Sequence, residues 1–273
     1  MAKDSPSQQR PAGRGMQHAS REINPNLADL PMLMCSFLSG LVDAASFNAA
    51  AVFVSMQTGN TVFIALGAAS LPAGDARRWL RALVSVASFL TGCTFFASMS
   101  RLLGPLRRST LFASFFLQTL LLVVCASLAQ TNVAPAFGIA NVDPFAHVDL
   151  QEKQARDDQW AVYLTVALLA FQSSGQIVLS RALGLGEIPS VVLTSLYCDL
   201  VSDPNVLQSS NTKRNRRALS VVLFMIGGIA SGWLQRTVVG VRGVLWIAAG
   251  IKLVIAFGWL VWKGKSKEGA DAS

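Results

Sequence analysis

Polar side chains that could recognise a small solute or an ion gather in one short part of an otherwise apolar region of this sequence. A carboxylate, three amides, a hydroxyl and a glycine fall within eighteen residues there, and they are Asp43, Asn48, Gln57, Thr58, Gly59 and Asn60. Groups of these kinds orient ligands inside otherwise apolar binding sites. Because this polar density exceeds what helix packing requires, the stretch is the first candidate binding site.

Asp43 lies near the middle of an apolar stretch that predicts a membrane helix. An ionised carboxylate at that depth costs ~2.5–3.5 kcal/mol on insertion scales, so it requires a partner or water. It could exchange a proton during transport, and Asp43→Asn would then abolish pH-dependent transport while folding stays largely intact. It could equally hold a serine or the backbone freed at a helix break. In both cases we expect Asp43 to be buried and to contact Lys252 or the second half of the chain.

Thr58, Gly59 and Asn60 combine a hydroxyl, a flexible backbone point and an amide. At the start of a short helix their backbone amides could face an anion or a polar substrate. Alternatively, the threonine or the asparagine could cap the helix by accepting a bond from its first amides. Both alternatives predict a helix start or a helix break at this point inside the membrane.

The second half of the chain carries a corresponding polar band at residues 172–176, and a threonine, Thr194, that matches Thr58. We assign a binding role to Gln172 and Gln176, and we expect the serines between them to join helices by hydrogen bonds. Lys252 lies near the centre of the last apolar run. Its side chain either extends to the membrane surface or pairs with a carboxylate such as Asp43.

Residues that enzymes use for acid–base or nucleophilic chemistry are too few and too scattered to form a site. The two histidines, His18 and His147, lie outside the apolar runs, and the four cysteines are far apart within them. This spacing predicts neither a metal site nor a disulfide framework. We therefore expect no catalytic activity, no metal and no cofactor.

The composition indicates what must hold these polar residues. Of 273 residues, 52% are hydrophobic and 14% charged, so the apolar surface exceeds what one soluble core needs. The excess must face a lipid bilayer. Basic residues form short clusters between apolar runs, which indicates membrane topology and attraction to anionic lipid and argues against nucleic-acid binding.

Six apolar runs reach the ~20 residues that a helix needs to cross a ~30 Å hydrocarbon core. They cover residues 31–50, 80–100, 110–129, 160–179, 218–235 and 244–262. Two further segments, 54–71 and 188–201, either cross as well, which gives eight spans, or form half-helices buried in protein. We favour an all-α polytopic bundle of six full spans and two short helices. Small residues around Gly92 and Gly227 predict close helix packing.

The transmembrane domain is expected over residues 29–265, between a disordered polar tail at 1–28 and a polar tail at 266–273. Its halves, 31–130 and 160–263, are joined by a polar loop at 131–159, whose excess of acids favours an external position. The halves match at an offset of 136 residues, which pairs Arg81 with Arg217 and predicts an internal duplication. If the matched basic clusters at 77–81 and 213–217 shared one side, eight spans would follow.

Two motifs resemble a known family. They are Gly40 to Phe47, with the pattern GxxDA, and Val52 to Thr61, with the pattern MxTGN. They are similar to the motifs of the YoaK family, also called DUF1275 or UPF0700 transmembrane proteins, over about residues 30–265. The counterpart in the second half, 189–194, is looser because Ser195 stands where glycine is expected. The resemblance implies a polytopic membrane protein and carries over no substrate or reaction.

These observations favour a small secondary transporter or permease for a small polar solute, with proton coupling as an option. The alternative is a scaffold or accessory subunit in which the polar residues merely satisfy broken helices. For either function the expected partners are the lipid bilayer and, as an open option, further copies of the chain. We expect the plasma membrane as its location in preference to internal membranes.

Overall fold

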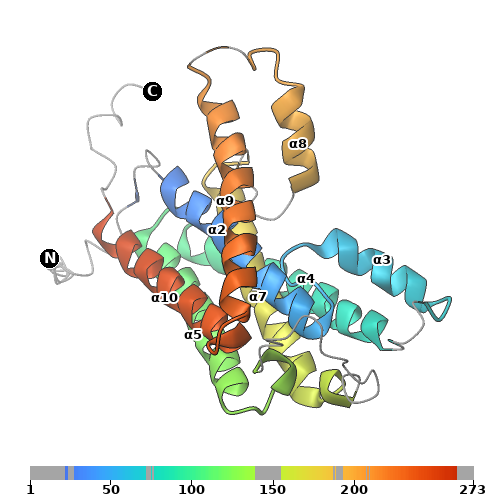
Figure 1. Ribbon diagram of the computed structural model, residues 1–273. Coiled ribbons are helices and arrows are strands. Elements are labelled where there is room, and N and C mark those ends of the chain that lie inside the picture. The colour runs from blue at the N-terminus through green and yellow to red at the C-terminus, as the bar shows by residue number, and fades with distance from the viewer. Residues whose placement is uncertain are drawn as a thin grey trace, which may run out of the picture.

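The computed structural model describes residues 22–23, 28–71, 75, 77–138, 155–186, 188, 193–206, 208 and 210–262, and it is a bundle of helices (Figure 1). Six helices are long and apolar enough to cross a membrane: α2 (Asp29–Ala50), α4 (Arg78–Leu103), α5 (Arg108–Gln130), α7 (Trp160–Ala182), α9 (Thr212–Gln235) and α10 (Gly240–Val261). Shorter elements are α3 (Gln57–Gly67), α8 (Leu193–Val201) and the turn η1 (Pro135–Phe137). The predicted all-α multi-pass bundle is confirmed. Most of both predicted tails and of the loop 131–159 lies outside the described residues.

The two short helices decide between six and eight spans. Helix α3 has 11 residues and α8 has nine, which at 1.5 Å per residue makes them ~16 Å and ~14 Å long. Neither length crosses a ~30 Å hydrocarbon core. They pack beside α4 and α9, respectively (Figure 1), so the described residues form six helices long enough to cross a membrane and two half-helices, which agrees with six full spans and gives no support to eight.

The long helices pack in a pattern that reflects the proposed duplication. The most extensive contacts join α2 to α9, α4 to α7, and α5 to α10. In chain order α2 corresponds to α7, α4 to α9, and α5 to α10. Exchanging the halves therefore turns the pair α2–α9 into α7–α4 and leaves α5–α10 unchanged. A bundle of two repeats related by a two-fold axis has this contact pattern.

The basic clusters of the two repeats lie at opposite ends of α2. Arg81 donates to the Ala50 carbonyl at the carboxyl end of α2, 3.0 Å away, and its guanidinium also binds Asp75 and Asp158. Arg216 instead pairs with Asp29 at the amino end of α2, at 3.2 Å. Because three full spans separate equivalent positions, the second repeat is inverted. The idea that the matched clusters share one side of the membrane is wrong.

This inversion makes a labelling result predictable. In a background without the native cysteines, Arg77→Cys and Lys213→Cys should react with a membrane-impermeant maleimide from opposite sides of the membrane. Both positions are exposed, and the basic clusters to which they belong lie at opposite ends of α2. The positive-inside rule places Lys213 in the cytoplasm. The measurement is labelling of intact cells against inverted vesicles, and same-side reactivity of the two cysteines would contradict the inverted repeat.

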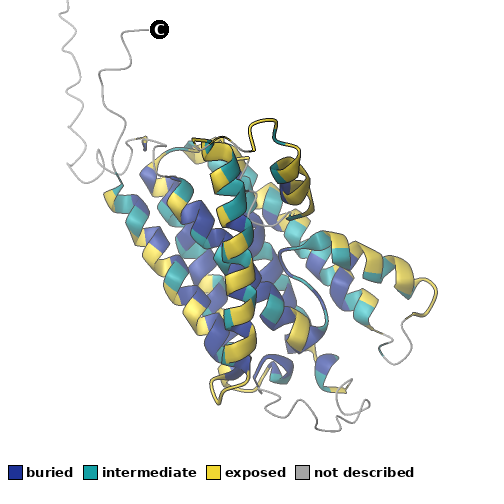
Figure 2. Ribbon diagram, turned by 45° about the horizontal axis from the view of Figure 1, so that its top comes forward, coloured by how far each residue is buried: buried dark blue, intermediate teal, exposed yellow. Residues whose placement is uncertain are grey.

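The outer helices present apolar faces of the kind that lipid requires. On α9, in front in Figure 2, the exposed residues include Leu219, Val222, Met225, Ile229 and Trp233. The inner face of α9 instead touches α2 through glycine: a Cβ atom added at Gly227 would lie 2.1 Å from the Phe37 carbonyl oxygen. Gly92 makes the equivalent close approach between α4 and α7. Close packing at these two glycines is therefore confirmed.

Candidate functional site

Asp43 is buried in the bundle and holds the segment that precedes α3. Its Oδ1 accepts from the amides of Val54 and Ser55, both at 2.8 Å, and its Oδ2 accepts from the Met56 amide at 3.2 Å and from the Ser55 hydroxyl. Its exposed fraction is 2%. The predicted burial is confirmed. The predicted contact with Lys252 or with the second half is wrong, because residues 54–56 take every lone pair that the carboxylate offers.

Asn60 secures the same segment from the other side. Its amide oxygen accepts from the Phe53 amide at 3.0 Å and its nitrogen donates to the Phe53 carbonyl at 2.7 Å. Ser85 of α4 donates to the same carbonyl at 2.7 Å, and Gln57 donates to the Val54 carbonyl at 3.0 Å. Asn60 is fully buried, and its side chain binds this backbone.

The motifs in residues 40–47 and 52–61 thus have a structural explanation. Non-helical backbone at membrane depth is tolerated only where its polar groups are satisfied inside protein. Asp43 and Asn60 supply the partners for residues 53–56, and Ser173 of α7 adds a bond to the Val54 carbonyl at 2.7 Å. The predicted helix start is confirmed at Gln57. A cap by Thr58 or Asn60 is wrong, because the residue before the helix is Met56 and the amides of residues 54–56 point to Asp43.

A pocket of about 330 Å³ lies beside this clamped segment. It brings together the first turns of the two half-helices, since Gln57, Thr58 and Gly59 line it from α3 and Thr194 lines it from α8. Phe53, Ser55, Met56, Phe89, Ile177 and Leu193 complete the lining. Neither threonine hydroxyl is used in a side-chain hydrogen bond with another described residue, and both residues are exposed.

The half-helices reach this pocket from opposite faces of the bundle. Helix α3 starts where Gln57 and Asn60 meet Ser85, in the interior of α4, and Gly67 near its end packs against Trp79 at the start of α4. Helix α8 starts at the pocket and ends near the start of α9, where Arg217 donates to the Asp199 carbonyl at 3.3 Å. The carboxyl ends of α3 and α8 thus lie near the starts of α4 and α9, which are at opposite faces of the bundle. The amino-terminal ends of α3 and α8 point inward from these faces and meet at the pocket.

Gln172 and Gln176 of the second polar band lie in the centre of the bundle, away from the lining of this pocket. Lys252 of α10 donates to the Gln172 side-chain oxygen at 2.5 Å and to that of Gln118 on α5 at 2.6 Å. Gln176 donates to Ser39 of α2 at 2.6 Å. Lys252 is 2% exposed, so its expected extension to the surface is wrong. Its expected pairing with a carboxylate is also wrong, because its hydrogen-bond partners among the described residues are the two glutamines.

Three central polar residues escaped the sequence analysis: Ser85, Gln118 and Gln235. Gln235, at the end of α9, accepts from Asn48 at 2.8 Å, so the candidate Asn48 joins α2 to α9 and does not line the pocket. Gln118 sits alone in the apolar run of α5. An isolated amide at membrane depth was the available signal, because it requires a partner from another helix.

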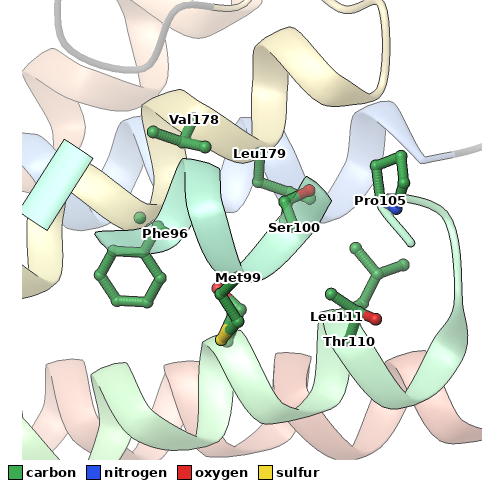
Figure 3. Close-up of a pocket in the computed structure, with 10 residues that line it drawn as sticks. Phe96, Met99, Ser100, Pro105, Thr110, Leu111, Val178 and Leu179 are labelled. Atoms are coloured by element: carbon green, nitrogen blue, oxygen red, sulfur yellow. The ribbon is translucent and has the colours of Figure 1, made fainter. Parts of the chain in front are cut away.

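A second candidate site in the described residues is small. A cavity of about 10 Å³ lies where α4, α5 and α7 meet and is lined mainly by apolar residues (Figure 3). It has room for about one water molecule. No group of three or more His, Cys, Asp or Glu residues in the described part of the chain could hold a metal ion.

The comparisons with known proteins place this arrangement in one family. A family model described as "Protein of unknown function (DUF1275)" matches residues 31–258, which include all six long helices and both half-helices in whole or in large part. No curated protein and no solved structure matches the chain.

Proposed function

We propose that this chain, a member of the DUF1275 family with six helices able to cross a membrane, is a small secondary transporter or permease for a small polar solute. Its binding site is the 330 Å³ pocket between the first turns of α3 and α8. Four of the residues that the sequence suggested as binding residues line this site: Gln57, Thr58, Gly59 and Thr194. Asp43, Asn48 and Asn60 become structural residues that hold the backbone or join helices.

One observation carries this proposal: Thr58 and Thr194, which are 136 residues apart and equivalent in the two repeats, line one pocket. In transporters built from inverted repeats, the solute site forms at the repeat interface from interrupted helices. The pocket volume lies at the lower end of the range for small-molecule sites. Rocking one repeat against the other would expose such a pocket to each side of the membrane in turn.

The lining favours an uncharged solute that has both polar and apolar parts. None of the ten lining residues carries a charge, and Thr58 and Thr194 offer hydroxyl groups among aromatic and aliphatic side chains. An anion would ordinarily be favoured at a helix amino terminus. Here the carboxylate of Asp43 already lies at this end of α3, where it accepts the Met56 amide, and its negative charge disfavours a second anion.

Cysteine accessibility tests the proposal without knowledge of the solute. In a background without native cysteines, Thr58→Cys and Thr194→Cys should each react with a membrane-impermeant maleimide added from either side of sealed vesicles, because a carrier site opens to both. Thr61→Cys, on the exposed outer side of α3, is the matched control. It should not show the same two-sided reactivity.

A scaffold or accessory subunit makes a different prediction for the same experiment. The saturation of Asp43 and Asn60 by backbone groups is the observation that favours this alternative, because it gives both residues a purely structural role. A scaffold has no reason to alternate, so the pocket cysteines would react from one side or from neither. That result would contradict a carrier.

A further inference from the structure

The centre of the bundle holds a lysine that has no acidic partner among the described residues. Lys252 lies midway along α10, is 2% exposed, and binds the side-chain oxygens of Gln118 and Gln172. Its Nζ also lies 6.0 Å from the centroid of the Phe115 ring. No carboxylate of the described residues lies within ion-pair distance of it. An ionisable residue at this depth is expensive, so its presence points to a function.

The hydrogen bonds of Lys252 suit both of its protonation states. A neutral amine has two N–H groups, and the two glutamine oxygens accept two N–H bonds. An ammonium group has a third N–H, for which the described residues supply no oxygen. A proton can therefore be gained or lost at this third position while both glutamine bonds persist. Packing alone would be served at lower energetic cost by an uncharged side chain.

The groups that surround Lys252 are almost all uncharged. Cys35 on α2 is the titratable side chain that interacts with it electrostatically. Asp43, two turns further along α2, is occupied by residues 54–56, and the facing parts of α5 and α7 contribute the two glutamines. The charged residues of α9 lie at its start, within 213–217, and η1 carries none. No neighbouring charge thus fixes the charge of Lys252.

A small cavity beside Lys252 shares a lining residue with the solute pocket. Beside the lysine lies a cavity of about 10 Å³, lined also by Ser39, Ser55, Gln172 and Gln176. This is room for about one water molecule, with the polar partners that such a water needs. Ser55 also lines the 330 Å³ pocket. The water-sized cavity and the solute pocket therefore share Ser55 in their linings.

From this geometry we infer that Lys252 is the proton-binding site that couples solute movement to the proton gradient. The inference rests on the proposed function. One proton reaches the neutral amine from the pocket through the neighbouring cavity, and it forms the third N–H bond of an ammonium group. The same N–H bond breaks when the pocket opens to the other side. The change in charge beside the glutamines biases the bundle between its two orientations.

A pH jump on protein reconstituted in liposomes of defined lipid tests this inference, with the proton itself as the probe. On a solid-supported membrane without added solute, the wild type should show a transient charge displacement. Lys252→Gln should lose most of this signal and keep only the part that comes from titration of surface groups. Lys213→Gln is the matched control, because it removes one lysine at the exposed start of α9 and should keep the wild-type signal.

Lys252→Arg separates proton exchange from a structural role of the charge. An arginine keeps a cation and its N–H donors but does not release a proton in the experimental range. The variant should stay folded, as judged by thermal unfolding, and still lose the transient. A transient that persists in Lys252→Arg, or that the wild type lacks, overturns the inference. The labelling of Thr58→Cys and Thr194→Cys is independent of protons, so two-sided labelling with no Lys252-dependent charge leaves the carrier and removes the coupling.

Discussion

Gly227→Ala should prevent most of the protein from folding, because the new methyl group has no space between α2 and α9. Its Cβ would lie 2.1 Å from the carbonyl oxygen of Phe37 and 3.0 Å from the amide nitrogen of Leu41. Both atoms belong to the backbone of α2, so no side-chain rotation relieves the overlap. The two helices must separate along their whole contact, and we expect a loss of ~3 kcal/mol or more, at the upper end of the range for overpacking.

Gly232→Ala, on the same helix, is the matched control for this variant. No atom lies within 4 Å of a Cβ added there. Alanine should therefore be neutral, or stabilise the helix by ~0.4–1 kcal/mol through the lower entropy of the unfolded chain. Thermal unfolding and the monodisperse fraction in detergent measure both variants. Equal stability of the two variants would show that α2 and α9 do not approach at Gly227.

Asp43→Ala should also destabilise the protein severely, because it leaves three backbone amides and one hydroxyl without an acceptor. A buried donor without a partner costs ~1–3 kcal/mol. With the lowest cost taken for each of the four donors, we expect a loss of at least ~4 kcal/mol in the free energy of unfolding. We therefore expect little folded protein and no order at the start of α3.

Asp43→Asn is the graded member of this series. Its remaining oxygen can still accept from the amides of Val54 and Ser55. Its NH₂ group, however, replaces the Oδ2 acceptor, so two hydrogen-bond donors face each other at the amide of Met56. The structure thus predicts reduced stability for this variant, between those of wild type and Asp43→Ala, instead of intact folding with altered pH dependence. Asp29→Asn, which removes a partly exposed ion pair with Arg216, should change stability by less than ~1 kcal/mol. Thermal unfolding in detergent measures the series, and wild-type stability of Asp43→Asn would contradict the clamp.

The sequence alone determined the helices and their number within narrow limits. Apolar runs of the length that crosses a bilayer are a local property, because each lipid-facing residue contributes its transfer energy largely independently of its distant neighbours. The start of α3 was also predictable, since Gly59 lies among polar residues where an apolar run begins. The same local reasoning showed that Asp43 had to be buried.

Only the tertiary structure decided which polar groups meet. Asp43 and Lys252 look complementary in the sequence, yet the carboxylate turns to residues 54–56 and the lysine to Gln118 and Gln172. Backbone amides only 11 to 13 residues further along the chain bind the carboxylate of Asp43. The packing of α5, α7 and α10 places the side-chain oxygens of two glutamines at Lys252.

The pocket depended on the tertiary structure in the same way. Thr58 and Thr194 share it because the second repeat is inverted, so that the two half-helices start at one place and run towards opposite faces. An offset of 136 residues indicates duplication but not orientation. Orientation follows from the number of complete crossings in each repeat, and that number depends on whether α3 and α8 span the bilayer. Their short helical lengths, which the apolar runs of the sequence overstate, settle it physically.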